Sequence, residues 1–300
     1  MTEADGPDRL LAVLRDAVDL RGARSLHVVV HAGTQGHAEV LRQLVADGPV
    51  RLTLVSGPGT DLSDLRSVVL EHGADAGAVL AGGRVHLLDE RGEPVPPSTV
   101  LTVVGLRLTT AELAAGRVPL VLHDDLTSRA VPDLLAAAGA ATARVHRAEL
   151  PEQLAVRGAV LAGGADGTLV ARDASPATAG LLALVHVLAE LGRQPHTLSV
   201  LAELYQPYVT AGPIAVEVAD ADGAVARVVE AYVTRPGGGP VESEEGDGLL
   251  VSHWDAPPPW WFAVRPAVDG VELTVEAADE DVLDKVRDDV LSLLRTGEDR

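Results

Sequence analysis

Few of the residue types that carry out protein chemistry occur here in a pattern that would let them act together. The ten histidines show no HExxH motif and no other close metal-ligand spacing, and the absence of cysteine excludes thiolate nucleophiles and disulfides. Gly33 and Gly36 follow an apolar run, but the full glycine fingerprint of a dinucleotide-binding turn is missing. Trp254, Trp260 and Trp261 offer rings that stack on sugars, although a predicted strand at this place favours packing. These residues do not indicate a particular reaction.

The composition describes a folded protein with an acidic surface. Hydrophobic residues make up 47% of the 300 residues and charged residues 23%, the ordinary balance of a folded chain. The formal net charge of −20 repels a phosphate backbone over most of the surface, so we predict no binding to nucleic acid. No apolar run is long enough to cross a bilayer, and the acidic amino terminus is unlike a secretion signal, so we predict no membrane partner. The lack of cysteine fits a reducing cytoplasm.

Strand and helix patterns alternate up to about Leu204, which is typical of an α/β architecture built from crossover units. Gly82 and Gly83 separate two apolar runs and predict a hairpin between them. The expected strands are Leu26–His31, Val50–Val55, Ala76–Leu80, Val85–Asp89, Pro119–His123 and Thr142–His146. The expected helices are Pro7–Leu20, His37–Ala46, Leu62–His72, Thr127–Ala138, Pro176–Leu191 and Ser199–Leu204.

The pattern changes after Gly212, where the sequence predicts an α+β domain with an open sheet. The segment Arg235–Gly248 is rich in Gly, Pro and Glu and is expected to be a surface loop. The expected strands are Ile214–Val218, Leu249–Ser252, Trp260–Val264 and Val271–Glu276, and the expected helices are Ala219–Tyr232 and Glu280–Leu294.

Several segments, taken in order, resemble bacterial phosphomannomutases and phosphoglucomutases. They are Glu71–Val95, His123–Ala140, Arg172–Gly192 and Trp260–Pro266. The first resembles the end of that family's second domain, the next the start of the third domain, and the last the fourth domain. The resemblance implies the phosphohexomutase fold, with residues 1–117, 118–211 and 212–300 as the counterparts of domains two, three and four. The implied fold class is α/β: two mutase-type α/β domains with mixed sheets, followed by a smaller α+β C-terminal domain.

The family, as the resemblance implies, moves a phosphoryl group between the 1- and 6-positions of a hexose. Such transfer depends on positioning and on neutralising oxygen charge, so a phosphoserine, a magnesium ion, a sugar loop and a phosphate loop act together. The phosphoserine is expected in a Thr-Ala-Ser-His-Asn loop of a first domain, ahead of everything recognisable here. Ser25, the first serine, is better explained as an ordinary residue at the start of a strand.

The family's metal loop reads Asp-Gly-Asp-x-Asp-Arg, because a hard cation needs several carboxylate oxygens at one point. The corresponding stretch, between Gly77 and Arg84, holds no carboxylate. It consists of Ala78, Val79, Leu80, Ala81, Gly82 and Gly83. Asp75 and Asp89 lie nearby but are better explained as strand-end and turn residues. We therefore expect no metal ligand and no cofactor, although the family uses magnesium.

The family's sugar loop reads Gly-Glu-x-Ser-Gly, and its carboxylate and hydroxyl bind the hexose hydroxyls. The corresponding stretch is Gly163–Gly167, with Gly164 at the glutamate position and Asp166 at the serine position. The Asp166 carboxylate can accept a hydrogen bond from a sugar, so weak sugar contact stays one interpretation. A turn formed by Ala165, Asp166 and Gly167 explains the same residues more simply.

The family's phosphate loop reads Arg-Pro-Ser-x-Thr-Glu-Pro and gives a guanidinium and two hydroxyls to the non-transferring phosphate. This chain keeps Arg265 and Pro266, but both hydroxyl positions are lost in the residues that follow. Two interpretations stay open for Arg265: it binds a phosphate, or it pairs with a carboxylate such as Asp269 or Glu272. The candidate substrate-binding residues are Arg265, Asp166, Gly164 and Gly167, and no catalytic residue is proposed.

The resemblance and the losses together predict a noncatalytic phosphohexomutase-like protein, a pseudoenzyme of carbohydrate metabolism. The partners that this implies are a hexose phosphate or a full-length mutase. The alternative is an active phosphomannomutase/phosphoglucomutase-type isomerase, an intramolecular phosphotransferase whose missing parts come from another chain.

Overall fold

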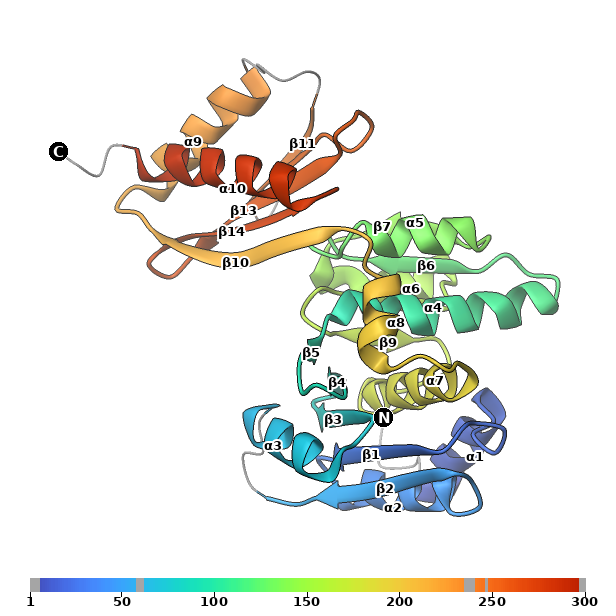
Figure 1. The fold of residues 1–300 in the computed structure, drawn as a ribbon. Coiled ribbons are helices and arrows are strands. Elements are labelled where there is room, and N and C mark those ends of the chain that lie inside the picture. The colour runs from blue at the N-terminus through green and yellow to red at the C-terminus, as the bar shows by residue number, and fades with distance from the viewer. Residues whose placement is uncertain (1–5, 58–61, 235–240, 246–247, 297–300) are drawn as a thin grey trace. The chain divides into compact units, whose positions relative to one another are not determined.

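The computed structural model describes residues 6–57, 62–234, 241–245 and 248–296 (Figure 1). The chain forms two compact units, Met1–Gln206 and Pro207–Arg300. Among the described residues, the buried apolar clusters of the first unit share no member with the cluster of the second, so each unit has its own core. None of the helices among the described residues is long and apolar enough to span a membrane.

The first sheet of the first unit has the strand order β2-β1-β3-β4-β5. Its strands are β1 (Leu26–His31), β2 (Val50–Val55), β3 (Ala76–Ala81), β4 (Arg84–Leu88) and β5 (Pro94–Val95). The connecting helices are α1 (Pro7–Ala17), α2 (Gln35–Val45) and α3 (Leu62–His72). Strand β1 pairs in parallel with β2 and β3, while β4 joins β3 in the opposite direction. The apolar run of β1 is buried along most of its length because the strand is central.

A second sheet repeats this order of strands, as β7-β6-β8-β9. Its strands are β6 (Leu120–His123), β7 (Ala141–Arg144), β8 (Leu161–Gly163) and β9 (Leu169–Ala171). The accompanying helices are α4 (Pro97–Ala114), α5 (Ala130–Ala137), a 3-10 turn (Arg147–Glu149) and α6 (Leu150–Arg157). Strand β6 is parallel to β7 and β8, and β9 returns antiparallel to β8. In both sheets, therefore, the third strand of the repeat leads directly into an antiparallel hairpin.

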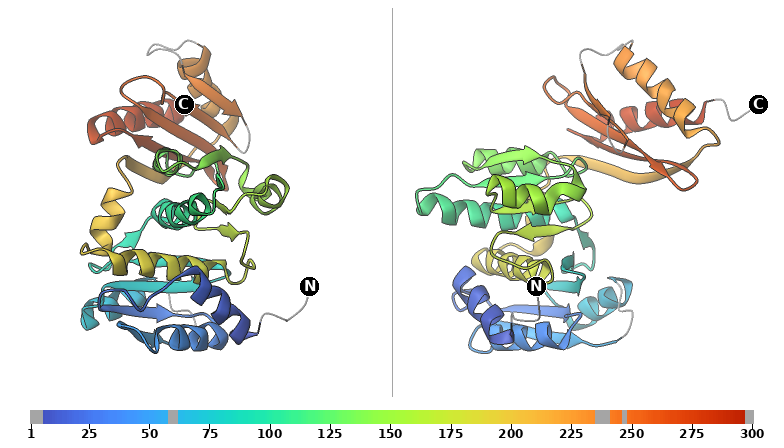
Figure 2. Two further views of the ribbon diagram at one scale, coloured as in Figure 1. Left: turned by 90° about the vertical axis from the view of Figure 1, so that its right-hand side faces the viewer. Right: turned by 180° about the vertical axis from the view of Figure 1, so that it is seen from behind.

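Helices α4 and α7 (Ala179–Arg193) tie the two sheets of the first unit together. Helix α7 packs against β3 and β4 of the first sheet, against β9 of the second, and against α4. Figures 1 and 2 show α7 running between the two sheets. Nearly all of its side chains are buried, as expected for a helix that is apolar on every face. The short helix α8 (Leu198–Leu204) follows and ends the unit.

The second unit is an antiparallel sheet in the order β10-β14-β13-β12-β11, packed against two helices. Its elements are β10 (Val209–Glu217), α9 (Ala221–Val229), a π-helical turn (Glu230–Thr234), β11 (Glu242–Glu245), β12 (Leu249–Ser252), β13 (Trp260–Ala267), β14 (Gly270–Ala277) and α10 (Glu280–Arg295). Phe262 is fully buried, and Trp261 is 6% exposed and donates from Nε1 to Glu276 Oε1 at 2.9 Å. Trp261 is therefore a packed core residue, as the favoured interpretation of the tryptophans predicted.

The expected fold class is confirmed: α/β with mixed sheets, then a smaller α+β part. The helix expected to begin at Pro176 begins at Ala179, and the one expected at Ala219–Tyr232 ends as an α-helix at Val229. The loop expected at Arg235–Gly248 was wrong for Glu242–Glu245, which form β11, while residues 235–240 and 246–247 lie outside the described residues. Helices α4 and α6 and the strands β5, β8 and β9 were not expected.

Candidate functional site

The β3–β4 turn stands where the family resemblance puts the metal loop. Gly82 and Gly83 form it between Ala81 and Arg84, with φ angles of +57° and +80°. Gly83 packs directly on the backbone ahead of α7, because a Cβ at this position would overlap the carbonyl oxygen of Pro176. The turn is therefore closed by glycine backbone and offers no carboxylate.

The β8–β9 turn stands at the position of the sugar loop and is closed by its own backbone. The N–H of Gly164 donates to the carbonyl of Thr168 at 2.9 Å, and the N–H of Gly167 donates to the carbonyl of Gly164 at 3.0 Å. Asp166 Oδ1 accepts from the N–H of Thr168 at 3.0 Å. The predicted turn at Asp166 and Gly167 is thus present, and one carboxylate oxygen of Asp166 is already used in it.

Asp124, which follows β6, holds the β8–β9 turn in place. Its buried carboxylate accepts from Thr127 Oγ1 at 2.7 Å and from the N–H of Ala165 at 3.2 Å. A Cβ at Gly164 would lie 2.7 Å from Asp124 Oδ2. Any side chain at position 164 would therefore have to displace the Asp124 carboxylate that holds the turn.

An ion cluster joins the two turns. Arg84 Nη2 lies 2.9 Å from Asp166 Oδ2, and Arg147 Nη1 lies 3.6 Å from the same oxygen. Burial alone would raise the pKa of Asp166, but the hydrogen bond from Thr168 and the charges of the two arginines outweigh it and lower the pKa. The Asp166 carboxylate is therefore ionised at neutral pH, and it serves two guanidinium groups rather than a metal.

The position of the metal loop does not fit a divalent cation. Magnesium requires several oxygen ligands in near-octahedral geometry. The β3–β4 turn presents glycine backbone and the Arg84 guanidinium, and the acidic group tied to it, Asp166, is already paired. Within the residues that the structure describes, no three His, Asp or Glu side chains are arranged to hold a metal. We accordingly derive no chemical step through magnesium.

The position of the phosphate loop is a tight β-hairpin in the second unit. Ala267 pairs with Gly270 at the end of β13 and β14, so only Val268 and Asp269 form the turn. Arg265 lies directly opposite Glu272 in the register of the two strands. Val268 is 100% exposed at the tip of the hairpin. A loop that could wrap a phosphate with hydroxyls and backbone N–H groups is therefore replaced by a two-residue turn.

Comparisons with known proteins find similarity in sequence and in fold. The chain is 29% identical over 191 residues to the phosphoglucosamine mutase of Azoarcus sp. (strain BH72), a match that covers 62% of this chain and 41% of that protein. The match therefore spans less than half the length of this curated relative. No family model matches the chain.

Solved structures show the same fold over almost the whole chain. A phosphoglucomutase/phosphomannomutase family protein from Burkholderia thailandensis superimposes with a TM-score of 0.75 at 19% identity, covering 98% of this chain and 65% of that one. An N-acetylglucosamine-phosphate mutase, described as a member of the alpha-D-phosphohexomutase superfamily, gives 0.56 at 10% identity over 96% of this chain and 64% of that one. The chain is therefore similar in sequence to part of the phosphoglucosamine mutases and similar in fold to phosphoglucomutase/phosphomannomutase structures.

Of the predicted substrate-binding residues, Gly164, Asp166 and Gly167 lie together in one turn of the first unit, and Arg265 lies in the second unit. Their role in substrate binding stays a prediction. Three further residues were not singled out from the sequence: Arg84, Arg147 and Asp124. A signal existed for Arg84, which ends the degenerate metal-loop stretch, and for Asp124, which follows the carboxyl end of a parallel strand.

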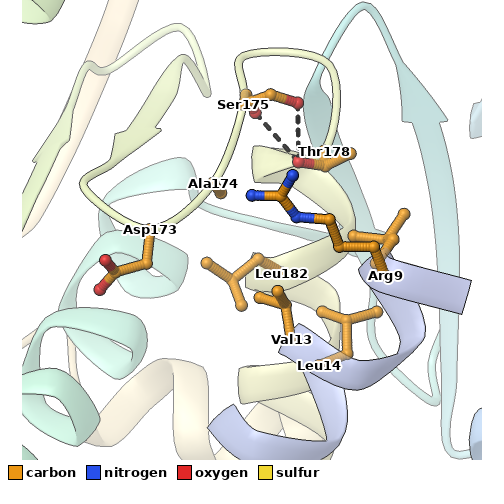
Figure 3. Close-up of a pocket in the computed structure, with 9 residues that line it drawn as sticks. Arg9, Val13, Leu14, Asp173, Ala174, Ser175, Thr178 and Leu182 are labelled. Carbon is orange, nitrogen blue, oxygen red and sulfur yellow. Dashed lines mark hydrogen bonds between the residues drawn. The ribbon is translucent and has the colours of Figure 1, made fainter. Parts of the chain in front are cut away.

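A small pocket of about 70 Å³ lies between α1 and the start of α7 (Figure 3). The side chain of Arg9 extends toward Thr178 in this view, and Leu182 forms part of the apolar lining. Ser175 Oγ and Thr178 Oγ1 lie 3.0 Å apart and bond to each other. A space of this volume has room for about two waters but not for a hexose phosphate.

A larger groove of about 1000 Å³ adjoins this pocket, since both are lined by Arg9, Val13, Asp173, Ala174 and Leu182. One end of the groove is organised around Glu112, whose carboxylate accepts from Arg117 Nε at 2.6 Å and from Arg172 Nη2 at 2.7 Å. These two hydrogen bonds lower the pKa of Glu112 from 4.5 to about 2.

Glu112→Gln should destabilise the first unit at neutral pH by about 1.5–3 kcal/mol, because it removes the charge from the hydrogen bonds that Glu112 accepts from Arg117 and Arg172. A carboxylate whose pKa is lower in the folded state stabilises the protein above its unfolded value, 4.5, and loses that effect as the pH falls toward about 2. Urea titrations of the wild type and the variant should give a difference in the free energy of unfolding that is largest at pH 7 and becomes smaller below pH 4.5. Glu39→Gln, at an ion pair with half-exposed side chains on α2, is the control and should change little. If the difference in the free energy of unfolding stays constant as the pH falls, the ionised Glu112 carboxylate is not the source of the stability.

Proposed function

We propose that this chain is a noncatalytic relative of the phosphohexomutases that binds a hexose phosphate without converting it. The observation that carries the proposal is the ion cluster of Arg84, Asp166 and Arg147. It occupies the place where a mutase would need a ring of carboxylates, and it leaves cationic donors suited to a phosphate or a sugar hydroxyl. We also propose a cytoplasmic location, because a chain without cysteine fits a reducing compartment.

The exposed character of this cluster supports binding rather than a purely structural role. The side chains of Arg84 and Arg147 are 45% and 47% exposed, while that of Asp166 is 25% exposed. An exposed ion pair contributes only about 0.2–1 kcal/mol, so a phosphate dianion can compete for the guanidinium groups at small cost.

The catalytic half of the proposal is tested with glucose 1-phosphate or mannose 1-phosphate, magnesium and the hexose bisphosphate activator. We expect no formation of the 6-phosphate above the rate without protein. Turnover that disappears in both Arg84→Gln and Arg265→Ala would overturn the proposal. The alternative, an active phosphomannomutase/phosphoglucomutase-type isomerase completed by another chain, predicts turnover once a chain that supplies the missing parts is added.

The binding half is tested by thermal stabilisation with the same two hexose phosphates in the absence of magnesium. A ligand that binds the folded state raises the melting temperature with concentration. We expect stabilisation of the wild type and about tenfold weaker binding in Arg147→Gln, which loses a charged hydrogen-bond donor. Arg157→Gln is the matched control, because Arg157 is an exposed arginine on α6 bonded to Gln153. No stabilisation at millimolar hexose phosphate would overturn this half and leave partner binding to be tested with a full-length mutase.

A further inference from the structure

The groove of about 1000 Å³ beside α1, α4 and α7 belongs to none of the loops described above. Its walls come from all three helices and from the segment after β9. Its size is at the upper end of the range for small-molecule sites, about 300–1000 Å³. Figure 3 shows the small pocket that adjoins it, with the side chains of α1 and α7 forming an apolar lining.

One end of this groove carries more positive than negative charge. Arg107 of α4 lies 3.4 Å from Glu190 of α7, and Arg193, one turn further along α7, also lines the groove. Arg193 makes no ion pair within 4.0 Å to a carboxylate of the described residues. Burial lowers the pKa of Arg107, as does the nearby charge of Arg193, and Glu190 opposes both. Two guanidinium groups and one carboxylate leave a net charge of +1. The α1 wall adds Arg9 and Asp16, which cancel.

A buried donor without a partner lies at the same end. Arg107 Nε donates to His186 Nδ1 at 3.2 Å, so the other ring nitrogen of neutral His186, Nε2, carries the proton. Nε2 is buried and has no hydrogen-bond partner among the described residues. This unpaired donor belongs to a residue that lines the groove.

The remainder of the groove is lined largely by aliphatic side chains. They include Val13, Val103, Leu106, Val160 and Leu182. At the opposite charged end, Glu112 is paired with Arg117 and Arg172, and Arg172 also pairs with Asp173, so these four charges cancel. The groove thus combines an aliphatic surface with one end whose single excess positive charge matches a monoanion better than a dianion.

We propose that this groove binds a small aliphatic monocarboxylate, with its carboxylate against Arg193 and Arg107 and its hydrocarbon chain on the aliphatic lining. The proposal is independent of hexose-phosphate binding at the two turns, because the groove and the ion cluster of Arg84 share no residue. A carboxylate at Arg193 would pair a cation of the groove that has no ion pair to a described residue, and the ligand's hydrocarbon would cover the aliphatic lining.

Isothermal titration calorimetry of the full chain with octanoate, octanol and octyl phosphate tests the proposal. We expect saturable binding of octanoate and weaker binding of both the neutral alcohol and the dianion. Arg193→Gln, at an exposed position, should weaken octanoate binding about tenfold without lowering the melting temperature. Glu190→Gln should strengthen it about two- to fivefold, because a competing carboxylate is removed. Arg42→Gln, on α2 outside the groove, is the control.

Different results of these titrations would contradict different parts of the proposal. The absence of saturable heat with millimolar octanoate would overturn the site. Octanol binding as tightly as octanoate, or octanoate binding unchanged in Arg193→Gln, would overturn the role of the arginines. Tighter binding of octyl phosphate would overturn the choice of a monoanion.

Discussion

Gly83→Ala should destabilise the first unit by about 3–5 kcal/mol, whereas Gly82→Ala, one residue earlier in the same turn, should cost only about 1–2 kcal/mol. Both glycines have positive φ, so both variants pay for a left-handed backbone. The difference comes from packing. A Cβ at Gly82 meets no atom within 4 Å, whereas a Cβ at Gly83 overlaps the carbonyl oxygen of Pro176, which is backbone and cannot rotate away. Urea denaturation of the two variants, followed by far-ultraviolet circular dichroism, measures the difference.

The same packing bears on whether a metal loop could be restored. A carboxylate at position 83 would need the backbone of the β3–β4 turn to move away from Pro176, so Gly83→Asp should be destabilised as strongly as Gly83→Ala and should bind no magnesium by calorimetry. A Gly83→Ala protein as stable as Gly82→Ala would show that the turn moves freely. In that case the close packing could not explain the lost carboxylates.

Much of the fold follows from sequence patterns that have a local cause. The glycine pair between two apolar runs predicted the β3–β4 hairpin, and the structure places its turn at Gly82 and Gly83. Helix α10 was also expected, and in the structure Asp279 caps it by accepting from the N–H of Val282 while apolar residues recur on one face. In both cases the deciding information lies within a few residues.

Helix α4 was missed because its sequence lacks the pattern of a surface helix. Threonine, valine and leucine fill its first turns, and the buried residues from Ser98 to Gly105 cover every face. The helix packs against α5 and α7, so no face needs to be polar. Its β-branched residues also favour strand patterns. Only the assembled unit shows why such a segment is helical.

The candidate site divides in the same way. The resemblance to phosphohexomutases located the two turns and singled out Asp166. Pairing of Asp166 with Arg84, which is 82 positions away, depends on how the two sheets pack and has no local signal. Arg147 lies in a short 3-10 turn with no motif around it. Sequence reasoning therefore found what the site had lost, and the structure showed which groups now fill it.

Phe262→Ala should destabilise the second unit by about 3–5 kcal/mol, because it empties the centre of that unit's core. Phe262 is fully buried, with its ring 5.0 Å from that of Tyr232 and 5.9 Å from that of Trp260. All three tryptophans of the chain, Trp254, Trp260 and Trp261, lie in the second unit. Tryptophan fluorescence therefore reports on this unit alone and should show its unfolding at a lower urea concentration.

Leu14→Ala provides the matched test in the first unit. Leu14 is fully buried in the core that α1 shares with the first sheet, and its loss should cost about 2–5 kcal/mol. Because the two units have separate cores, Leu14→Ala should lower the transition seen by circular dichroism while leaving the tryptophan transition in place. If either variant shifts both transitions together, the two cores unfold as one cooperative block. The division into two independently stabilised units would then be wrong.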